Sequence, residues 1–138
     1  PQGEGQMAAL HRAMVNAGTE AGDIGYINAH GTGTAKNDAA EFLSLHTLFE
    51  GAAPSVSSTK SMTGHLLGGA GGVESVFTIK ALEEQVSPPT INVFGQDPEC
   101  DIDCCPNEAR RMEINYAMKN SFGFGGTNST VIYKRWTE

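Results

Sequence analysis

The chain has 138 residues, of which 39% are hydrophobic and 18% charged, with a net charge of −7 and a pI near 5.0. This length and composition indicate one globular domain with a single core and exclude a disordered chain. The acidic balance disfavours a nucleic-acid partner, which requires a basic face, and no apolar stretch approaches the ~20 residues of a membrane span.

Helices and strands are expected to alternate along the first two thirds of the chain. Apolar residues at helical spacing indicate the helices, and short apolar runs bounded by turn residues indicate the strands. The expected elements are a helix over 7–15, a strand over 24–29, a helix over 38–49, a strand over 54–60 that ends at Lys60, and a helix over 72–84.

The last third begins with Pro88 and Pro89, which prevent the preceding helix from continuing. Residues 90–112 are predicted to be irregular and rich in turns. Two strands, over 115–121 and 128–135, close the chain and are expected to form an antiparallel pair. The whole order predicts an α/β fold with a parallel sheet that ends in this pair.

The first candidate functional residue, His30, follows the first predicted strand and precedes Gly31-Thr32-Gly33-Thr34. Glycines allow a tight turn and a close approach of a ligand to the backbone. A histidine at such a place can act as an acid, a base or a neutral hydrogen-bond donor. The alternative is a histidine that is only tied into a turn.

A second cluster, formed by Lys60, His65 and Glu74, lies between the second strand and the following helix. A lysine at the end of a strand is half-buried, and a buried ammonium needs a partner, for which Glu74 is the candidate. Polar groups at strand ends, held by glycine-rich turns, are typical of sites in α/β proteins. The alternative is a surface lysine followed by a helix-capping turn.

The glycines of residues 68–72 lack the G-x-G-x-x-G spacing of a dinucleotide site, and Lys60 precedes them instead of closing a phosphate loop. Nucleotide binding is therefore disfavoured. Three cysteines, Cys100, Cys104 and Cys105, form no C-x2-C pair, and acidic neighbours raise the pKa of a thiol, so we expect neither a metal site nor a nucleophile there. Their odd number favours a reducing compartment, and we expect a cytoplasmic protein.

Four motifs are similar to those of one enzyme family in their order and spacing. They are NAHGTGT at 28–34, VSSTKSMTGHLLGGAGGVE at 56–74, PPTIN at 88–92 and NSFGFGGTN at 120–128. Together they resemble the C-terminal part of a β-ketoacyl-[acyl-carrier-protein] synthase of the bacterial elongating kind, called type II. The resemblance extends over essentially the whole chain, which begins without a start methionine, so we expect a piece of a longer protein.

The resemblance implies the C-terminal half of a thiolase-like α/β fold, with a mixed five-stranded sheet layered with helices. We expect residues 1–138 to form one such domain, incomplete at its N-terminus and lacking its first strand, which we place centrally in the sheet. It also implies a decarboxylative Claisen condensation of an acyl thioester with malonyl carrier protein, in fatty-acid or polyketide elongation, with no cofactor.

Catalytic roles follow from the same resemblance. His30 and His65 match the two histidines that bind the malonyl thioester and stabilise its enolate. Lys60, paired with Glu74, matches the lysine that orients the site and tunes its charge. The substrate-binding residues that the resemblance implies are Thr32, Thr34, Phe124 and Gly125, of which the threonines hold the pantetheine arm, Phe124 is the gating residue, and the glycine-rich loop supplies the oxyanion hole.

The family's nucleophilic cysteine has no equivalent in this chain, and Gly33 stands where relatives of this type commonly have serine. We therefore expect the 138 residues by themselves to lack condensing activity. The implied partners are an acyl carrier protein, the N-terminal half of the synthase and a second copy in a homodimer. Two alternatives remain open: a non-catalytic partner subunit of the chain-length-factor type, and a thiolase, which uses different motifs.

Overall fold

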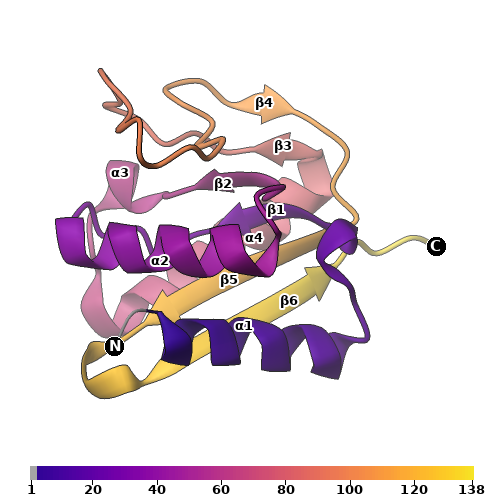
Figure 1. Ribbon diagram of the computed structural model, residues 1–138. Coiled ribbons are helices and arrows are strands. Elements are labelled where there is room, and N and C mark those ends of the chain that lie inside the picture. Colours follow the sequence, from indigo (N-terminus) through magenta and orange to yellow (C-terminus); the bar gives the residue numbers. More distant parts are fainter. Residues whose placement is uncertain (1–2) are drawn as a thin grey trace.

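The computed structural model describes residues 3–138 and is shown in Figure 1. Four α-helices and six strands are joined by short 3-10 turns. The helices are α1 (Glu4–Ala17), α2 (Ala35–Leu48), α3 (Lys60–Thr63) and α4 (Ala70–Glu84). The strands are β1 (Ile24–Asn28), β2 (Ser55–Ser57), β3 (Val86–Ser87), β4 (Arg110–Arg111), β5 (Tyr116–Phe122) and β6 (Asn128–Lys134).

The main sheet is mixed and has the strand order β2-β1-β5-β6. β1 runs parallel to both β2 and β5, whereas β5 and β6 form the predicted antiparallel pair. The sheet has four strands, one fewer than the five expected of a complete half. β1 and β5 are directly hydrogen-bonded, with Ile27 opposite Met118 and Asn28 opposite Lys119, so the described strands are contiguous.

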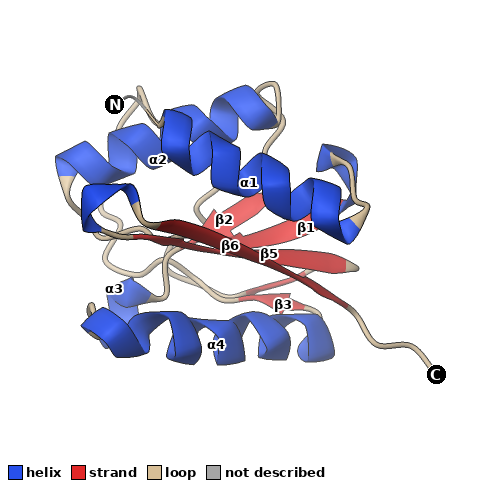
Figure 2. Ribbon diagram, turned by 90° about the horizontal axis from the view of Figure 1, so that it is seen from below, coloured by secondary structure: helices blue, strands red, loops and turns tan. Residues whose placement is uncertain are grey.

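The sheet lies between two layers of helices, as Figure 2 shows. α1 and α2 cover one face, and α4 covers the other. One apolar cluster, which includes Leu10 of α1 and Leu45 of α2, packs against Ile27 and Met118 of the sheet. A smaller cluster joins Leu82 of α4 to the opposite face. Because side chains alternate along a strand, the neighbours of Ile27 and Met118 point towards α4.

The predicted helices and the last two strands are confirmed within a few residues, but one local expectation was wrong. The second strand ends at Ser57, and Lys60 begins the short helix α3 instead of ending a strand. In α4 the buried face carries Glu74 and Thr78, whereas Val76 is 57% exposed. The inner face of this helix therefore combines polar residues with apolar ones.

Residues 90–109 are irregular, as expected, and pass outside the edge of the sheet at β2 (Figure 1). The short strands β3 and β4 pair antiparallel on either side of this segment. Within residues 3–138, no helix is long and apolar enough to cross a membrane.

Candidate active site

The site lies where the parallel strands β1, β2 and β5 end. Parallel strands bring their carboxyl ends to one edge of the sheet, which is where α/β folds bind ligands. His30 follows β1, and Lys60 follows β2 by three residues. Both side chains are buried, and the Lys60 Nζ lies 3.5 Å from the Nδ1 of His30. The topology thus joins two motifs that are 30 residues apart.

The backbone at His30 is held by Glu41, a buried residue of α2. The N–H of His30 donates to Oε1 of Glu41 at 2.9 Å, and the N–H of Gly31 donates to Oε2 at 2.8 Å. Asn120 of β5 donates its side-chain amide to the same Oε1 at 3.4 Å. One carboxylate therefore fixes the turn that carries His30, although burial raises its own pKa.

The predicted ion pair between Lys60 and Glu74 is confirmed, with Nζ and Oε1 2.7 Å apart and both side chains buried. A second lysine, Lys119 of β5, lies 3.3 Å from the same carboxylate oxygen. Burial lowers the pKa of Lys119 to about 8, against the opposing effect of Glu74. Two buried ammonium groups thus share one carboxylate.

His65 completes the cluster from the loop after α3. Its ring lies 5.4 Å from the ring of His30 between centroids, in a nearly perpendicular arrangement, and the ring of Phe122 lies 6.0 Å from His30 on another side. The backbone N–H of Leu67 donates to Nδ1 of His65 at 3.0 Å. A neutral imidazole that accepts at Nδ1 carries its proton on Nε2, so His65 offers an Nε2–H donor.

His30 is neutral at physiological pH. Burial lowers its pKa to about 4, and the positive charge of Lys60 acts in the same direction. Because the ammonium of Lys60 can only donate, it faces an unprotonated Nδ1. The proton of the neutral ring therefore lies on Nε2, as it does in His65. The cluster presents two neutral imidazole donors.

The predicted substrate-binding residues lie on exposed loops around this cluster. The hydroxyl oxygens of Thr32 and Thr34 are 2.9 Å apart, and Thr34 also accepts from the N–H of Asn37 and so caps α2. Phe124 is fully exposed, and Gly125 has a positive φ of 74°, a conformation that favours glycine. Phe122, two residues before Phe124, is the phenylalanine that contacts His30.

Glu41 and Lys119 were missed in the sequence. Each left a signal in its own element. Glu41 lies four residues before Leu45, so it shares the buried face of an amphipathic helix. Lys119 stands in the middle of the buried strand β5. A charged residue at a core position needs a partner, and that requirement could have singled out both.

The cysteine segment lies apart from these residues. Burial raises the pKa of Cys100 and Cys104, and nearby aspartates add to it, so neither thiol is activated. Within residues 3–138, no group of three or more histidine, cysteine or acidic side chains is arranged to hold a metal ion.

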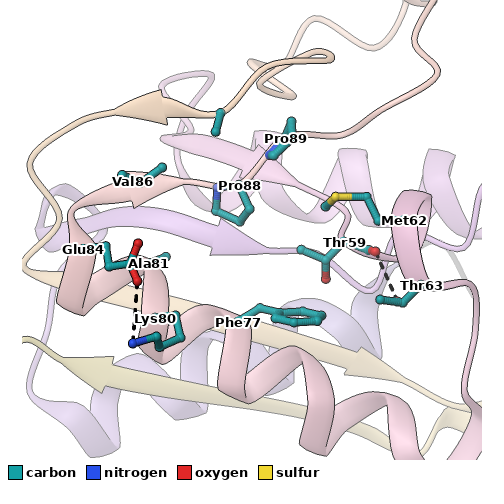
Figure 3. A pocket seen from close by; sticks show the side chains of 11 residues that line it. Thr59, Met62, Thr63, Phe77, Lys80, Ala81, Glu84, Val86, Pro88 and Pro89 are labelled. Atoms are coloured by element: carbon teal, nitrogen blue, oxygen red, sulfur yellow. Dashed lines mark hydrogen bonds and ion pairs between the residues drawn. The ribbon is translucent and has the colours of Figure 1, made fainter.

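An apolar hollow of about 330 Å3 lies beside the cluster, between α3, α4 and the Pro88-Pro89 turn. Figure 3 shows Met62 and Phe77 facing it, with Lys80 and Glu84 at one end. None of the described residues that line it belongs to the predicted site, although Thr59 directly precedes Lys60.

Comparison with known proteins shows the family of the chain. Residues 1–94 match the family described as "Beta-ketoacyl synthase, C-terminal domain". The chain belongs to the β-ketoacyl synthase family. Two curated relatives named 3-oxoacyl-[acyl-carrier-protein] synthase 2 are similar to it over 138 residues, with 47% identity in Staphylococcus aureus and 46% in Synechocystis sp.. Each comparison covers 99% of this chain and 33% of the relative, so the chain spans about a third of their length.

Solved ketosynthase structures confirm the thiolase-like fold. A β-ketoacyl synthase from Burkholderia phymatum is 36% identical, with a TM-score of 0.94. The ishigamide ketosynthase/chain length factor is 34% identical, with a TM-score of 0.96. Both comparisons cover 99% of this chain and 34% of the solved chain. The family resemblance found in the four motifs is thus confirmed.

The lowered pKa of His30 predicts a loss of stability in mild acid. In the unfolded chain the imidazole has an ordinary pKa near 6.5 and takes up a proton below it, while the folded chain does not until about pH 4. The free energy of unfolding should therefore fall as the pH drops from 6.5 to 4. Urea unfolding at several pH values measures this, and His30→Gln should reduce the slope; an unchanged slope would contradict the prediction.

The shared carboxylate predicts a strong effect of Glu74→Gln. The substitution leaves two buried ammonium groups without their common counter-charge, and the free energy of unfolding should fall by about 3–5 kcal/mol. The matched control is Glu83→Gln on the same helix, because Glu83 pairs with Lys80 at the exposed surface. That change should stay within about 0.5 kcal/mol. Equal losses of unfolding free energy in the two variants would show that the buried ion pair stabilises the fold no more than the exposed one.

Proposed function

We propose that this chain supplies the enolate-stabilising half of the active site of a 3-oxoacyl-[acyl-carrier-protein] synthase. The observation that carries the proposal is the pair of neutral imidazoles, His30 and His65, whose rings lie 5.4 Å apart at the end of the parallel strands. In each ring Nδ1 faces a donor, so the proton of the neutral imidazole lies on Nε2. The 46–47% identity to condensing enzymes supports the same reaction.

The reaction has two stages. An acyl group is first transferred from its carrier to a cysteine thiol. In the second stage the bond between the carboxylate and the α-carbon of malonyl carrier protein breaks, carbon dioxide leaves, and the electron pair remains as an enolate. The α-carbon then attacks the acyl thioester, a carbon–carbon bond forms, and the cysteine leaves as a thiolate. No cofactor takes part in this balance.

The enolate oxygen is where charge develops, and neutral donors aimed at such an oxygen in a water-poor site are an effective source of rate enhancement. The two rings are close enough for one thioester oxygen to accept from the Nε2–H of both His30 and His65. Lys60 keeps the Nδ1 of His30 unprotonated, so the ring binds the enolate as a neutral donor. The residues of this chain therefore stabilise the enolate without becoming charged themselves.

The exposed loops around the cluster would receive the rest of the substrate. Thr32 and Thr34 offer hydroxyls to the pantetheine arm, and the Phe124–Gly126 turn offers backbone N–H groups to the oxyanion formed during acyl transfer. The exposed position of Phe124 suits a gating side chain that the bound acyl group moves. A related ketosynthase structure, 34% identical, contains a type II polyketide acyl carrier protein in complex with its ketosynthase, which supports a carrier protein as the partner here.

The nucleophilic cysteine is assigned to the part of the relatives that this chain does not span. None of the three cysteines here lies in the histidine cluster, and Cys105 is completely buried. A chain-length-factor subunit is the second candidate, because related structures, including a complex from Xenorhabdus doucetiae, contain such a factor. The neutral histidine pair with its lysine favours the catalytic alternative.

The histidine roles can be measured in the full-length gene product. His30→Ala and His65→Ala should each lower the rate of malonyl carrier protein decarboxylation by about 100-fold, because each removes one donor to the enolate oxygen. Acylation of the protein by an acyl carrier protein should be reduced much less. The control is His11→Ala on the exposed side of α1, which should leave both steps unchanged. Equal loss of acylation and decarboxylation would contradict the assignment.

The position of the nucleophile provides a separate prediction. After reaction of the full-length gene product with radiolabelled acyl carrier protein, peptide mapping should find the acyl group on a cysteine outside these 138 residues. The Cys100→Ser and Cys104→Ser variants should take up as much radiolabelled acyl group as the wild type. Label on a peptide from residues 1–138 would contradict the proposal, and a product without any acylated cysteine would identify a chain-length-factor type.

A further inference from the structure

Lys119 is a buried charge to which the proposed reaction gives no role. It lies on β5 next to the end of the sheet where the histidines meet, and only 2% of its side chain is exposed. Its strand neighbours on the same face, Ala117 and Ser121, are small and leave room for a long side chain beneath α4. Placing a charged residue there costs free energy by desolvation, so the position requires partners.

The ammonium of Lys119 donates to the backbone carbonyl of Asn120, and its charged partner is the carboxylate that holds Lys60. Oε1 of Glu74 accepts from Lys60 at 2.7 Å and lies 3.3 Å from the Nζ of Lys119. The other oxygen, Oε2, is buried and has no hydrogen-bond partner among residues 3–138. The orientation of this carboxylate therefore depends on the two lysines alone. Without Lys119, only Lys60 would hold Glu74 in place.

Glu41, the second buried carboxylate of the site, is also linked to Lys119. Burial raises the pKa of Glu41, which fixes the backbone of His30, and the hydrogen bonds to its carboxylate and the charge of Lys119 oppose that rise. Asn120, the next residue on the strand, donates to Glu41 directly. Two carboxylates and two ammonium groups thus form one compensated set around His30.

We propose that Lys119 is a positioning residue of this site, whose buried ammonium holds Glu74 against Lys60 and thereby keeps Lys60 directed at the imidazole of His30. Among residues 3–138, no hydrogen bond links Lys119 to either histidine, so its contact with the site is through Glu74, while its charge acts on His30 from a distance. The inference concerns the geometry and charge at His30. Its test by enzymatic activity rests on the proposed condensing function, whereas its test by NMR spectroscopy of His30 does not.

The charge of Lys119 should depend on pH within an accessible range. Its pKa of about 8 means that the ammonium is present at pH 7 and is lost as the pH rises above 8. Loss of that charge removes one of the positive neighbours that lower the pKa of His30. The titratable groups that face or surround Lys119 are Glu74 of α4, Lys60 of α3, Glu41 of α2, His30 after β1 and Tyr26 of β1, whose pKa burial raises.

The test uses the full-length gene product with 13Cε1-labelled histidine. In the wild type, the His30 resonance should show an inflection near pH 8, and Lys119→Arg, which keeps the charge, should abolish it. Lys119→Met fills the same space without a charge and should raise the pKa of His30. Lys134→Met, at an exposed position of β6, serves as the control and should change nothing.

The activity arm measures malonyl carrier protein decarboxylation against pH. Lys119→Met should be at least about 10-fold slower at pH 7, because Lys60 is displaced from His30. The rate of the wild type should fall above pH 8; Lys119→Met should lose this fall, and Lys119→Arg should keep the rate and move the fall to higher pH.

The two arms separate the possible failures. An unchanged His30 resonance in Lys119→Met, together with no inflection near pH 8 in the wild type, would overturn the role of Lys119. The expected His30 shifts in a gene product without decarboxylase activity would support that role and refute the condensing function instead. If Lys119→Met does not fold, the comparison of wild type with Lys119→Arg decides the question by the inflection alone.

Discussion

The buried carboxylate of Glu74, shared by Lys60 and Lys119, is the interaction on which the geometry of this site depends. A carboxylate buried between a helix and a sheet is stable only when its charge is compensated, and two ammonium groups from different elements provide that compensation. The same contact ties α4, α3 and β5 to one another at the end of the sheet. The contacts that compensate the charge of Glu74 therefore also hold Lys60 beside His30.

The parallel pairing of β1 with β2 and β5 explains why this compensation can occur at all. Three carboxyl ends meet at one edge, so the residues that follow them are neighbours whatever their distance in the chain. The alternation of side chains along β5 then divides the charges, with Lys119 towards α4 and Asn120 towards Glu41 of α2. His30 is held at its backbone from one face of the sheet and at its ring from the other.

The elements and the family were predictable, because both depend on local patterns and linear motifs. Helical spacing identified α1, α2 and α4, and the ion pair of Lys60 with Glu74 followed from the need of a buried ammonium for a partner. The predictions failed where the local structure or the contacts of a residue depend on its three-dimensional surroundings. Lys60 begins α3 instead of ending a strand, and the partner of Glu74 from the sheet, Lys119, was not foreseen.

The sequence by itself determined the order of the elements, the residue types of the site and the reaction that they resemble, because these are carried by spacing along the chain. Only the tertiary structure decided that β1 and β5 are neighbours in the sheet, that Glu41 fixes the turn of His30, and that Lys119 joins the pair of Lys60 and Glu74. Contacts between residues 45 to 79 positions apart follow from strand order and from the alternation of side chains. Neither of these can be derived from the neighbours of a residue in the sequence.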